Sequence, residues 1–457
     1  MWSPAPWYAL SASTTSPEAA RRRRMRAPMQ SRNEVLDSTG SHLLTMGRGD
    51  SHLGRLWGTR TAASLVIFIW ATLSAGTFAS TPQQSNTAFG QIVEKAKRAS
   101  EESRLDEAAA LYVRALALRP RWADGWWSLA TLEYDQDHYA KAAADFAKLI
   151  ELQPKNGTAH AMLGLCQFEL GKDEPALKNL LSAEQLGIIK DEQLRHVALY
   201  HMGVLELRMR KFGDAKETLD QLARARVRTK ELITSLGLAV LLVRPQDAPP
   251  DGTPGSTVID RAGDAEALLA AKDYDKAKQT YVELTGEFPA YPNLHFAFGR
   301  LLLETNETDA AVEQFQLELK RDPDNLNSLL EIAAVRYLVD SEDGLRYAEK
   351  ALKLAPRLPF AHYLVGLLRL DTGNAAGAIP ELQIAQKAFP NEGRIYFSLG
   401  NAYARTGQKE AAAKARAEFA RLNTLEAKKR GPSLYSDRPP GLAEGKLETL
   451  GTGKPPS

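Results

Sequence analysis

Residues 123–154 read ADGWWSLATLEYDQDHYAKAAADFAKLIELQP. Two apolar segments in this stretch are separated by a polar turn, which predicts a pair of helices. Each segment has a small residue near its middle and large residues around it: Trp126, Leu129 and Ala130 in the first, and Ala142 and Phe146 in the second. Pro154 ends the second helix, because its ring clashes with the preceding turn.

The same pattern recurs along the chain. Pro120 and Pro154 are 34 residues apart, as are Pro289 and Pro323, and Pro356 and Pro390. A fixed period of this length indicates stacked supersecondary units. Placing these prolines at position 32 starts the repeats at residues 89, 123, 157, 196, 230, 258, 292, 326, 359 and 393. Position 8 is always small: Ala96, Ala130, Gly164, Gly203, Gly237, Ala265, Gly299, Ala333, Gly366 and Gly400.

Small residues also occupy position 20 of every complete repeat. Antiparallel helices approach closely only where facing side chains are small, so both positions predict tightly paired helices. The residues that best match a known pattern are Trp126 to Ala130 with Ala142, Phe146 and Pro154, and His362 to Gly366 with Ala378, Leu382, Ala385 and Pro390. Over residues 89–424 the chain resembles the tetratricopeptide repeat family, and in particular exported bacterial arrays. The resemblance implies an all-α, right-handed α-solenoid of antiparallel helix pairs, with nine complete repeats and one half repeat.

Repeat five departs from the pattern. Its first helix is present at 231–243, but residues 244–255 contain four prolines and cannot form the second. Either the stack continues past a protruding loop, or the loop joins two arrays. We favour the first arrangement, because Leu232, Ile233, Leu236 and Leu242 need burial. The expected organisation is a leader at 1–80, a first array at 81–243 with its half repeat at 230–243, a Pro-rich loop at 244–257, a second array with a C-terminal cap at 258–424, and a disordered tail at 425–457.

The first eighty residues have the features of an export leader. They carry a formal charge of +5, against −3 for the remainder. An apolar run at 62–75 follows Arg55 and Arg60 and is followed by small residues, as in a secretory signal. We expect initiation at Met46, a signal at 46–79 with cleavage after Ala79, and a periplasmic or secreted protein. The alternative is an uncleaved helix at 62–79 that anchors the protein to the inner membrane.

Composition excludes several kinds of site. A single cysteine, Cys166, rules out a disulfide framework and any multi-cysteine metal centre, and we expect it to be a buried structural thiol. His160, His295 and His362 all fall at position 4, in separate repeats, which favours packing over metal binding. A slightly acidic array gives no broad attraction for nucleic acid. We therefore expect no cofactor, no metal and no nucleic acid.

Aromatic residues are frequent where the resemblance implies a concave, peptide-binding groove, at positions 2, 5, 9, 12 and 13. The candidate groove residues are Trp127, Tyr134, Phe168, Tyr200, Phe296, Arg300, Phe360, Tyr363, Phe397 and Arg405. These rings either bind a ligand or pack against neighbouring first helices. The Lys and Asn pattern of the family's carboxylate clamp is missing, although Asn401 is present.

These observations predict a non-catalytic scaffold that binds an extended peptide or protein segment in its groove. The first alternative is a glycan-binding or envelope-polysaccharide accessory protein that uses the same rings. The second is an enzyme with an unrecognised site near repeat five. No phosphate loop, His-Glu-x-x-His helix or Gly-x-Ser-x-Gly elbow occurs in the sequence.

Overall fold

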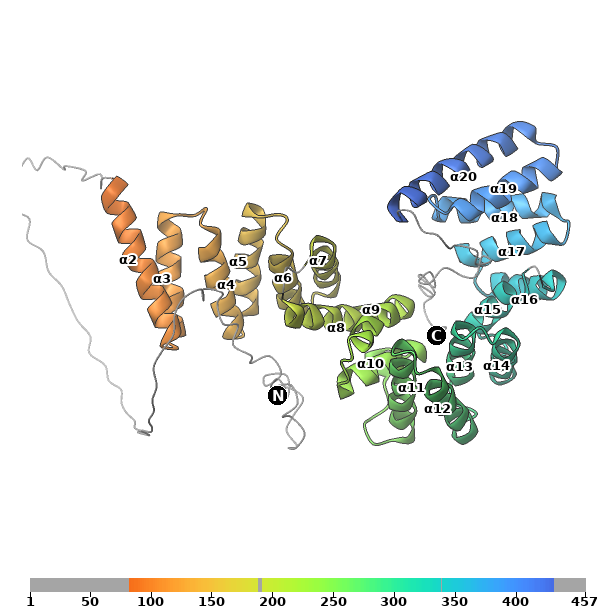
Figure 1. Ribbon diagram of the computed structural model, residues 1–457, viewed down its shortest axis with the longest axis horizontal. Coiled ribbons are helices and arrows are strands. Elements are labelled where there is room, and N and C mark those ends of the chain that lie inside the picture. The colour runs from red at the N-terminus through yellow and green to blue at the C-terminus, as the bar shows by residue number, and fades with distance from the viewer. Residues whose placement is uncertain (1–81, 188–190, 338, 431–457) are drawn as a thin grey trace, which may run out of the picture. The chain divides into compact units, whose positions relative to one another are not determined.

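The computed structural model describes residues 82–187, 191–337 and 339–430 (Figure 1). They form two compact modules: the first ends at Leu152 and the second begins at Gln153. The N-terminal module contains α2 (Pro82–Glu101), α3 (Leu105–Leu118), α4 (Ala123–Asp135) and α5 (Tyr139–Leu152). The C-terminal module contains α6 (Gly157–Glu169), α7 (Asp173–Leu186), α8 (Glu192–Arg208), α9 (Phe212–Arg224), α10 (Lys230–Val240), the 3₁₀ turn η2 (Pro245–Asp247), α11 (Pro254–Ala270), α12 (Tyr274–Glu287), α13 (Leu294–Glu304), α14 (Thr308–Arg321), α15 (Leu326–Arg336), α16 (Ser341–Leu354), α17 (Pro359–Asp371), α18 (Ala375–Ala388), α19 (Gly393–Arg405) and α20 (Lys409–Arg430).

Successive helices pack as antiparallel pairs, which confirms the predicted all-α solenoid architecture. In the C-terminal module the first helix of one repeat also contacts the first helix of the next, as α15, α17 and α19 do. No strand occurs in the described part of the chain. The repeats therefore present their first helices side by side.

The small residues at position 8 lie where a large side chain from the second helix crosses. A Cβ atom added at Gly299 would lie 2.5 Å from Cε1 of Phe315, and one added at Gly366 would lie 2.6 Å from Cγ of Leu382. Both large residues stand sixteen positions later in the repeat and are fully buried. The predicted role of the small residues in helix pairing is confirmed.

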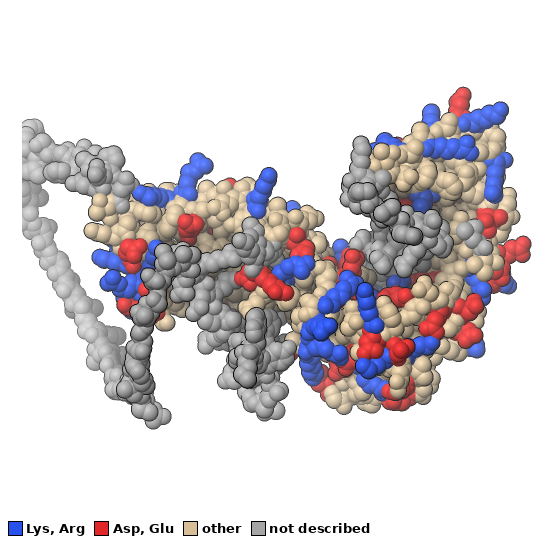
Figure 2. All heavy atoms as spheres, viewed as in Figure 1, with Lys and Arg blue, Asp and Glu red and all other residues tan. Residues whose placement is uncertain are grey.

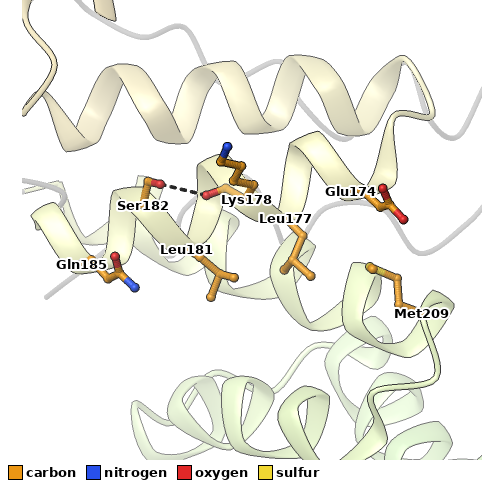
Figure 3. Close-up of a pocket in the computed structure, with 7 residues that line it drawn as sticks. All are labelled: Glu174, Leu177, Lys178, Leu181, Ser182, Gln185 and Met209. Atoms are coloured by element: carbon orange, nitrogen blue, oxygen red, sulfur yellow. Dashed lines mark hydrogen bonds between the residues drawn. The ribbon is translucent and has the colours of Figure 1, made fainter. Parts of the chain in front are cut away.

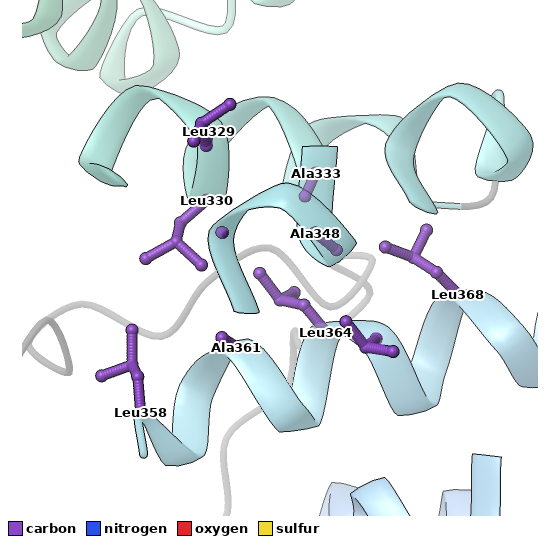
Figure 4. Packing of buried hydrophobic residues seen from close by; sticks show 10 residues of the cluster. Leu329, Leu330, Ala333, Ala348, Leu358, Ala361, Leu364 and Leu368 are labelled. Atoms are coloured by element: carbon purple, nitrogen blue, oxygen red, sulfur yellow. The ribbon is translucent and has the colours of Figure 1, made fainter. Parts of the chain in front are cut away.

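Neighbouring repeats are held together by shared apolar clusters. Figure 4 shows one of them, in which side chains of α15 and α17 point toward each other across the small residue Ala348 of α16. Its labelled members are Leu329, Leu330, Ala333, Ala348, Leu358, Ala361, Leu364 and Leu368. A residue of one repeat is thus buried by the next, so a repeat gains much of its stability from its neighbours.

The first helix of repeat five, α10, packs on α11 in place of the missing second helix. Helix α10 packs on α9 and on α11, and α11 also packs on α12. Leu232, Ile233 and Leu236 are buried as predicted, whereas Leu242 is only half-buried. Helix α11 therefore forms one helix pair with α10 and another with α12.

Helix α11 begins at Pro254, so the last four residues of the predicted Pro-rich loop, 254–257, are helical. Pro254 occupies its first turn, where a missing N–H is tolerated, and the Thr253 hydroxyl accepts a hydrogen bond from the Ser256 amide at 3.3 Å. Helices α10 and α11 cross at two glycines. A Cβ on Gly237 would overlap the carbonyl oxygen of Ile259, and one on Gly263 would overlap that of Ile233.

Several predictions concern the two ends of the chain. The leader at 1–80, its start at Met46, its cleavage after Ala79 and the alternative anchor at 62–79 lie outside the described residues, as does 431–457. Helix α20 continues to Arg430, past the predicted start of the tail at 425. Among the described helices, none combines the length and apolarity needed to cross a bilayer.

Candidate binding surface

In the N-terminal module, the predicted groove rings are half-buried and pack on second-helix rings. Trp127 of α4 meets Phe146 of α5 edge-on at a centroid distance of 5.6 Å. Tyr134 meets Tyr139 in the same way at 5.4 Å. These contacts hold α4 against α5 and leave part of each ring in contact with solvent.

The next pair of predicted rings connects two repeats. Phe168 of α6 lies edge-on to His201 of α8 at 4.6 Å, and the Arg208 guanidinium carbon lies 4.5 Å from its ring centroid. Tyr200 lies 5.5 Å from the His201 ring. An aromatic ring held between an imidazole and a guanidinium stabilises the α6–α8 contact.

Two predicted groove residues are occupied by internal contacts. Phe296 is only 4% exposed and packs on Phe315 at 5.9 Å, so its ring is part of the core of repeat seven. Arg300 of α13 forms an ion pair with Glu331 of α15 at 2.6 Å. Phe296 is therefore too buried to belong to the candidate surface.

The remaining predicted residues lie on the first helices of the last two repeats, α17 and α19. Phe360 and Tyr363 of α17 lie 6.2 Å apart, and Tyr363 packs against the apolar cluster that contains Ile395 and Leu399 of α19. Burial, only partly opposed by the charge of Arg394, raises the pKa of Tyr363 to about 12. Arg405 donates to the carbonyl of Leu370 at 2.5 Å and so links α19 to α17.

Phe397 is the exception to the pattern of packed rings. Its side chain touches Phe419 of α20 at a centroid distance of 5.4 Å, yet it is 52% exposed on the first helix of the last repeat. Fully packed aromatic residues bury most of their surface. Phe397 lies on α19, which contacts the helix α17 that carries the half-buried Phe360 and Tyr363. Among the predicted residues, the first helices α17 and α19 therefore carry the most exposed ring.

A buried charge cluster was not predicted. The Lys216 ammonium of α9 forms ion pairs with Asp220 at 2.8 Å, with Glu266 of α11 at 2.6 Å and with Glu304 of α13 at 3.3 Å. Asp220 and Glu266 are almost fully buried. We call these four residues the Lys216 cluster. It joins three helices at the place where repeat five lacks its second helix.

Burial and mutual attraction oppose each other in the Lys216 cluster. Burial raises the pKa of Glu266 to about 7, although the ammonium of Lys216 lowers it. Burial lowers the pKa of Lys216, but Glu266, Asp220 and Glu304 outweigh this and hold it well above its usual value. Lysine therefore stays charged in the folded protein. The cluster could not be predicted from the sequence, because its members are up to 88 residues apart and form no local motif.

A surface hollow of about 380 Å³ lies on the second helix α7 (Figure 3). It is lined by Glu174, Leu177, Lys178, Leu181, Ser182 and Gln185 of α7 and by Met209, which follows α8. The Ser182 hydroxyl donates to the backbone carbonyl of Lys178 at 2.9 Å. This arrangement offers an apolar floor with polar edges and no pair of groups in nucleophile–base contact.

Comparison with protein families decides what kind of repeat this is. One family model described as a tetratricopeptide repeat matches residues 268–332, and a second with the same description matches 93–156, 128–186, 334–392 and 363–422. Together these matches span more than half of the chain.

The chain belongs to the tetratricopeptide repeat family.

Tetratricopeptide repeats are protein-interaction repeats, so the protein is, in general terms, a protein-interaction scaffold. A comparison with curated proteins finds no match. Similar solved structures include crystal structures of MamA. One shows 19% identity over 36% of this chain and 96% of its own, with a TM-score of 0.33. A MamA RS-1 double mutant shows 21% identity over 37% and 98%, with a TM-score of 0.34. The family assignment rests on the repeat matches.

The histidines at position 4 of the tetratricopeptide repeats fill a structural role. His160, His295 and His362 each contact the polar side chain nineteen residues later, on the second helix of the same repeat: Asn179 at 3.0 Å, Gln314 at 2.7 Å and Glu381 at 2.6 Å. Their predicted packing role is confirmed by these contacts. Cys166 is fully buried as expected, and burial raises the pKa of its thiol to about 12.

His201 makes the second repeat of the C-terminal module sensitive to acid. Its Nδ1 donates to the Val197 carbonyl at 2.7 Å, yet burial, reinforced by Arg208, lowers the pKa of the ring to about 4. Between pH 4 and about pH 6.5, His201 is protonated in the unfolded chain but mostly neutral in the folded protein. The contribution of His201 to the free energy of unfolding is therefore complete above about pH 6.5 and is lost as the pH falls toward 4.

We expect the wild-type protein to lose on the order of 2–3 kcal/mol of unfolding free energy through His201 over this range. Urea unfolding between pH 7 and 4, compared with the His201→Gln variant, measures the effect. The variant should show a flatter profile. Parallel profiles for the two proteins would assign the acid sensitivity to other groups.

Proposed function

We propose that the protein is a non-catalytic scaffold that binds an extended peptide or protein segment along the first helices α17 and α19. Family membership supports a protein partner, and tetratricopeptide arrays are typically non-catalytic. The observation that carries the proposal is the exposed ring of Phe397 on α19, the helix that packs on α17 with its Phe360 and Tyr363. Rigid aromatic side chains give large contact area at small entropic cost, which makes them frequent anchors in interfaces.

Two arginines lie on the same helix as Phe397. Arg394 of α19 is half-buried and Arg405 is exposed near the end of α19. Charged and polar groups around an apolar anchor give an interface its rim, while the anchor supplies most of the affinity. Figure 2 shows that acidic and basic side chains are intermixed over α8 to α12, in contrast to the continuous basic surface of a nucleic-acid-binding protein.

We further propose that the protein works outside the cytoplasm, because residues 55–79 combine a basic flank with an apolar run and small residues. Sequencing the N-terminus of the protein recovered from its host tests this. A first residue at Ser80 supports cleavage of a leader. A mature protein that retains residues 46–79 in a soluble cytoplasmic fraction contradicts the proposal.

Substituting Phe397 tests the binding surface directly. Partners captured from an envelope extract are identified, and synthetic peptides that tile the partner are then titrated against the purified protein. We expect Phe397→Ala to weaken the best peptide about tenfold, the effect of removing an anchor worth more than 1 kcal/mol. Because Phe397 is half-exposed, its folding stability should change little.

Ile384 provides the matched control. It is 42% exposed on α18, the second helix of the preceding repeat, and lies outside the proposed surface. Ile384→Ala should leave peptide affinity unchanged. Equal affinities for the wild type and Phe397→Ala, or an equal loss in both variants, would contradict the proposed surface.

A further inference from the structure

Three positions that earlier repeats bury are uncovered in the last repeat. In the repeats at 292, 326 and 359, positions 5, 24 and 27 are buried in eight of nine cases, and the ninth residue, Tyr363, is half-buried. The repeat at 326 is one residue short before Gly344. The residues are Phe296, Leu330 and Tyr363 at position 5, Phe315, Ala348 and Leu382 at position 24, and Glu318, Ala351 and Ala385 at position 27. In the last repeat these positions hold Phe397 and Arg416, which are exposed, and Phe419, which is half-buried.

The following repeat is what buries these positions. In the repeat at 359, Leu382 and Ala385 share an apolar cluster with Ile395 and Leu399 of α19. The repeat at 326 shares a cluster with α17 in the same way. Helix α20 is the last helix that the structure describes, so the equivalent side of the last repeat stays uncovered within the described chain. We call the three residues on this side the terminal seam: Phe397, Arg416 and Phe419.

The terminal seam is more apolar than the end of a soluble repeat array needs to be. Terminal repeats keep an array soluble through a polar outer face. Here the Phe397 and Phe419 rings lie 5.4 Å apart, and Phe397 is 52% exposed. Exposed apolar groups with a polar rim mark interaction surfaces. Helix α19 covers this side of the preceding repeat with Ile395 and Leu399, which are one helical turn apart, so an amphipathic helix has the shape that fits.

Arg416 gives the terminal seam a positive charge. It occupies the position that faces Gly400, and its Cγ would lie 3.1 Å from a Cβ on that glycine. Its stem therefore lies where earlier repeats place a large apolar side chain, while the residue itself is exposed. Arg421 of the same helix pairs with Glu418, but the Arg416 side chain forms no ion pair or hydrogen bond with the residues that the structure describes. Its guanidinium is available to a carboxylate beside two aromatic rings.

The charge of the last repeat differs from that of its neighbours. Residues 393–425 contain six basic and two acidic residues, a formal charge of +4, and Figure 2 shows mainly basic side chains over α20. The formal charges of 292–325, 326–358 and 359–392 are −4, 0 and −1, and that of the first repeat, 89–122, is +2. Two copies that met through their last repeats, or through a last and a first repeat, would bring like charges together. An acidic partner is attracted instead.

We propose that the terminal seam binds an amphipathic helix with an acidic polar face, carried by another protein. Apolar side chains of this helix cover Phe397 and Phe419, as α19 covers the preceding repeat, and one of its carboxylates pairs with Arg416. The helix extends the stack by one element. The proposal rests on the proposed function for a protein partner at Phe397, but it adds α20 and a charge requirement that an extended peptide on α17 and α19 does not have.

A peptide that copies α19 provides the probe. Residues 392–406 are synthesised with Arg394→Glu and Arg405→Glu, which makes the peptide acidic and keeps Ile395 and Leu399. The control peptide has the original sequence. Each peptide is labelled at its N-terminus and titrated with the full chain by fluorescence anisotropy. We expect the acidic peptide to bind about tenfold tighter than the original at low salt, and to lose this advantage as added salt screens the charges.

Variants of the full chain locate the binding site. Arg416→Glu should weaken the acidic peptide about tenfold and should bind the original, basic peptide better than the wild type does. Phe419→Ala should weaken both peptides. Lys414 provides the control, because it is exposed and lies about 200° around α20 from Arg416. Lys414→Glu makes the same change of charge and should leave both affinities unchanged.

Four results would overturn the proposal. Two are an acidic peptide that binds no better than the original, and an equal loss of affinity in Arg416→Glu and Lys414→Glu. Self-association of the wild type that Phe419→Ala abolishes would make a second copy the occupant, and a gain in peptide affinity on removal of 431–457 would make that segment the occupant. Failure of the proposed function looks different: the extended peptides keep their affinity in Phe397→Ala, whatever the Arg416 comparison shows.

Discussion

Replacing Gly263 by alanine is expected to unfold the region around α10 and α11. The new Cβ would occupy the space of the Ile233 carbonyl oxygen, which belongs to a helical backbone and cannot rotate away. Ordinary overpacking in a core costs about 1–3 kcal/mol. A clash with backbone on both sides of a helix crossing should cost about 3 kcal/mol or more. Urea unfolding of the full chain, followed by circular dichroism, measures the loss.

Gly286 separates this steric effect from the general preference of helices for alanine. It lies in α12, and a Cβ there would meet nothing within 4 Å. Gly286→Ala should be neutral or should stabilise the protein by up to about 1 kcal/mol, because alanine loses less backbone entropy. Similar stabilities for Gly263→Ala and Gly286→Ala would show that α10 and α11 do not cross at this glycine.

Replacing Lys216 by methionine is expected to remove a comparable amount of stability through charge. The variant keeps the length of the side chain but leaves Asp220 and Glu266 buried without their cation. Removing one partner of a buried ion pair typically costs 3–5 kcal/mol. Because burial already raises the pKa of Glu266, we expect the loss to shrink as the pH falls below about 6 and the carboxylates become neutral. Urea unfolding at pH 8 and pH 5 measures both effects.

Two further variants define the origin of this loss. Lys276 pairs with Asp273 at 2.7 Å on the surface of the same module, where such a pair contributes about 0–1 kcal/mol. Lys276→Met should therefore have a small effect. Adding Glu266→Gln to Lys216→Met should recover part of the loss, since it removes one of the stranded charges. If Lys216→Met and Lys276→Met are equally mild at pH 8, the cluster does not hold α9, α11 and α13 together.

The repeat architecture could be predicted because its determinants recur at fixed positions. Gly299 and Gly366 could be recognised as pairing residues because their places in the repeat are filled by glycine or alanine throughout. The prediction was less accurate at the Pro-rich loop. A proline predicts a break in a helix, whereas Pro254 lies in the first turn of α11, where its ring and missing N–H are tolerated.

The candidate surface was only partly predictable. Repeat position alone gave the same weight to Phe397, which is exposed, and to Phe296, whose ring is buried against the large facing residue Phe315. The Lys216 cluster follows from the missing second helix of repeat five, which lets α9 contact α11 directly. Such a contact becomes visible only when helices far apart in sequence are placed in space.

The double use of α11 has a consequence for how such arrays change length. Tandem duplication or deletion changes such an array by whole helix pairs. If a single helix were lost, the first and second helices of every later repeat would exchange places in the stack. Here α11 closes the pair begun by α10 and opens the pair completed by α12. The array can therefore tolerate an odd number of helices, and a designed helix in place of residues 244–253 would lengthen the protein by half a repeat.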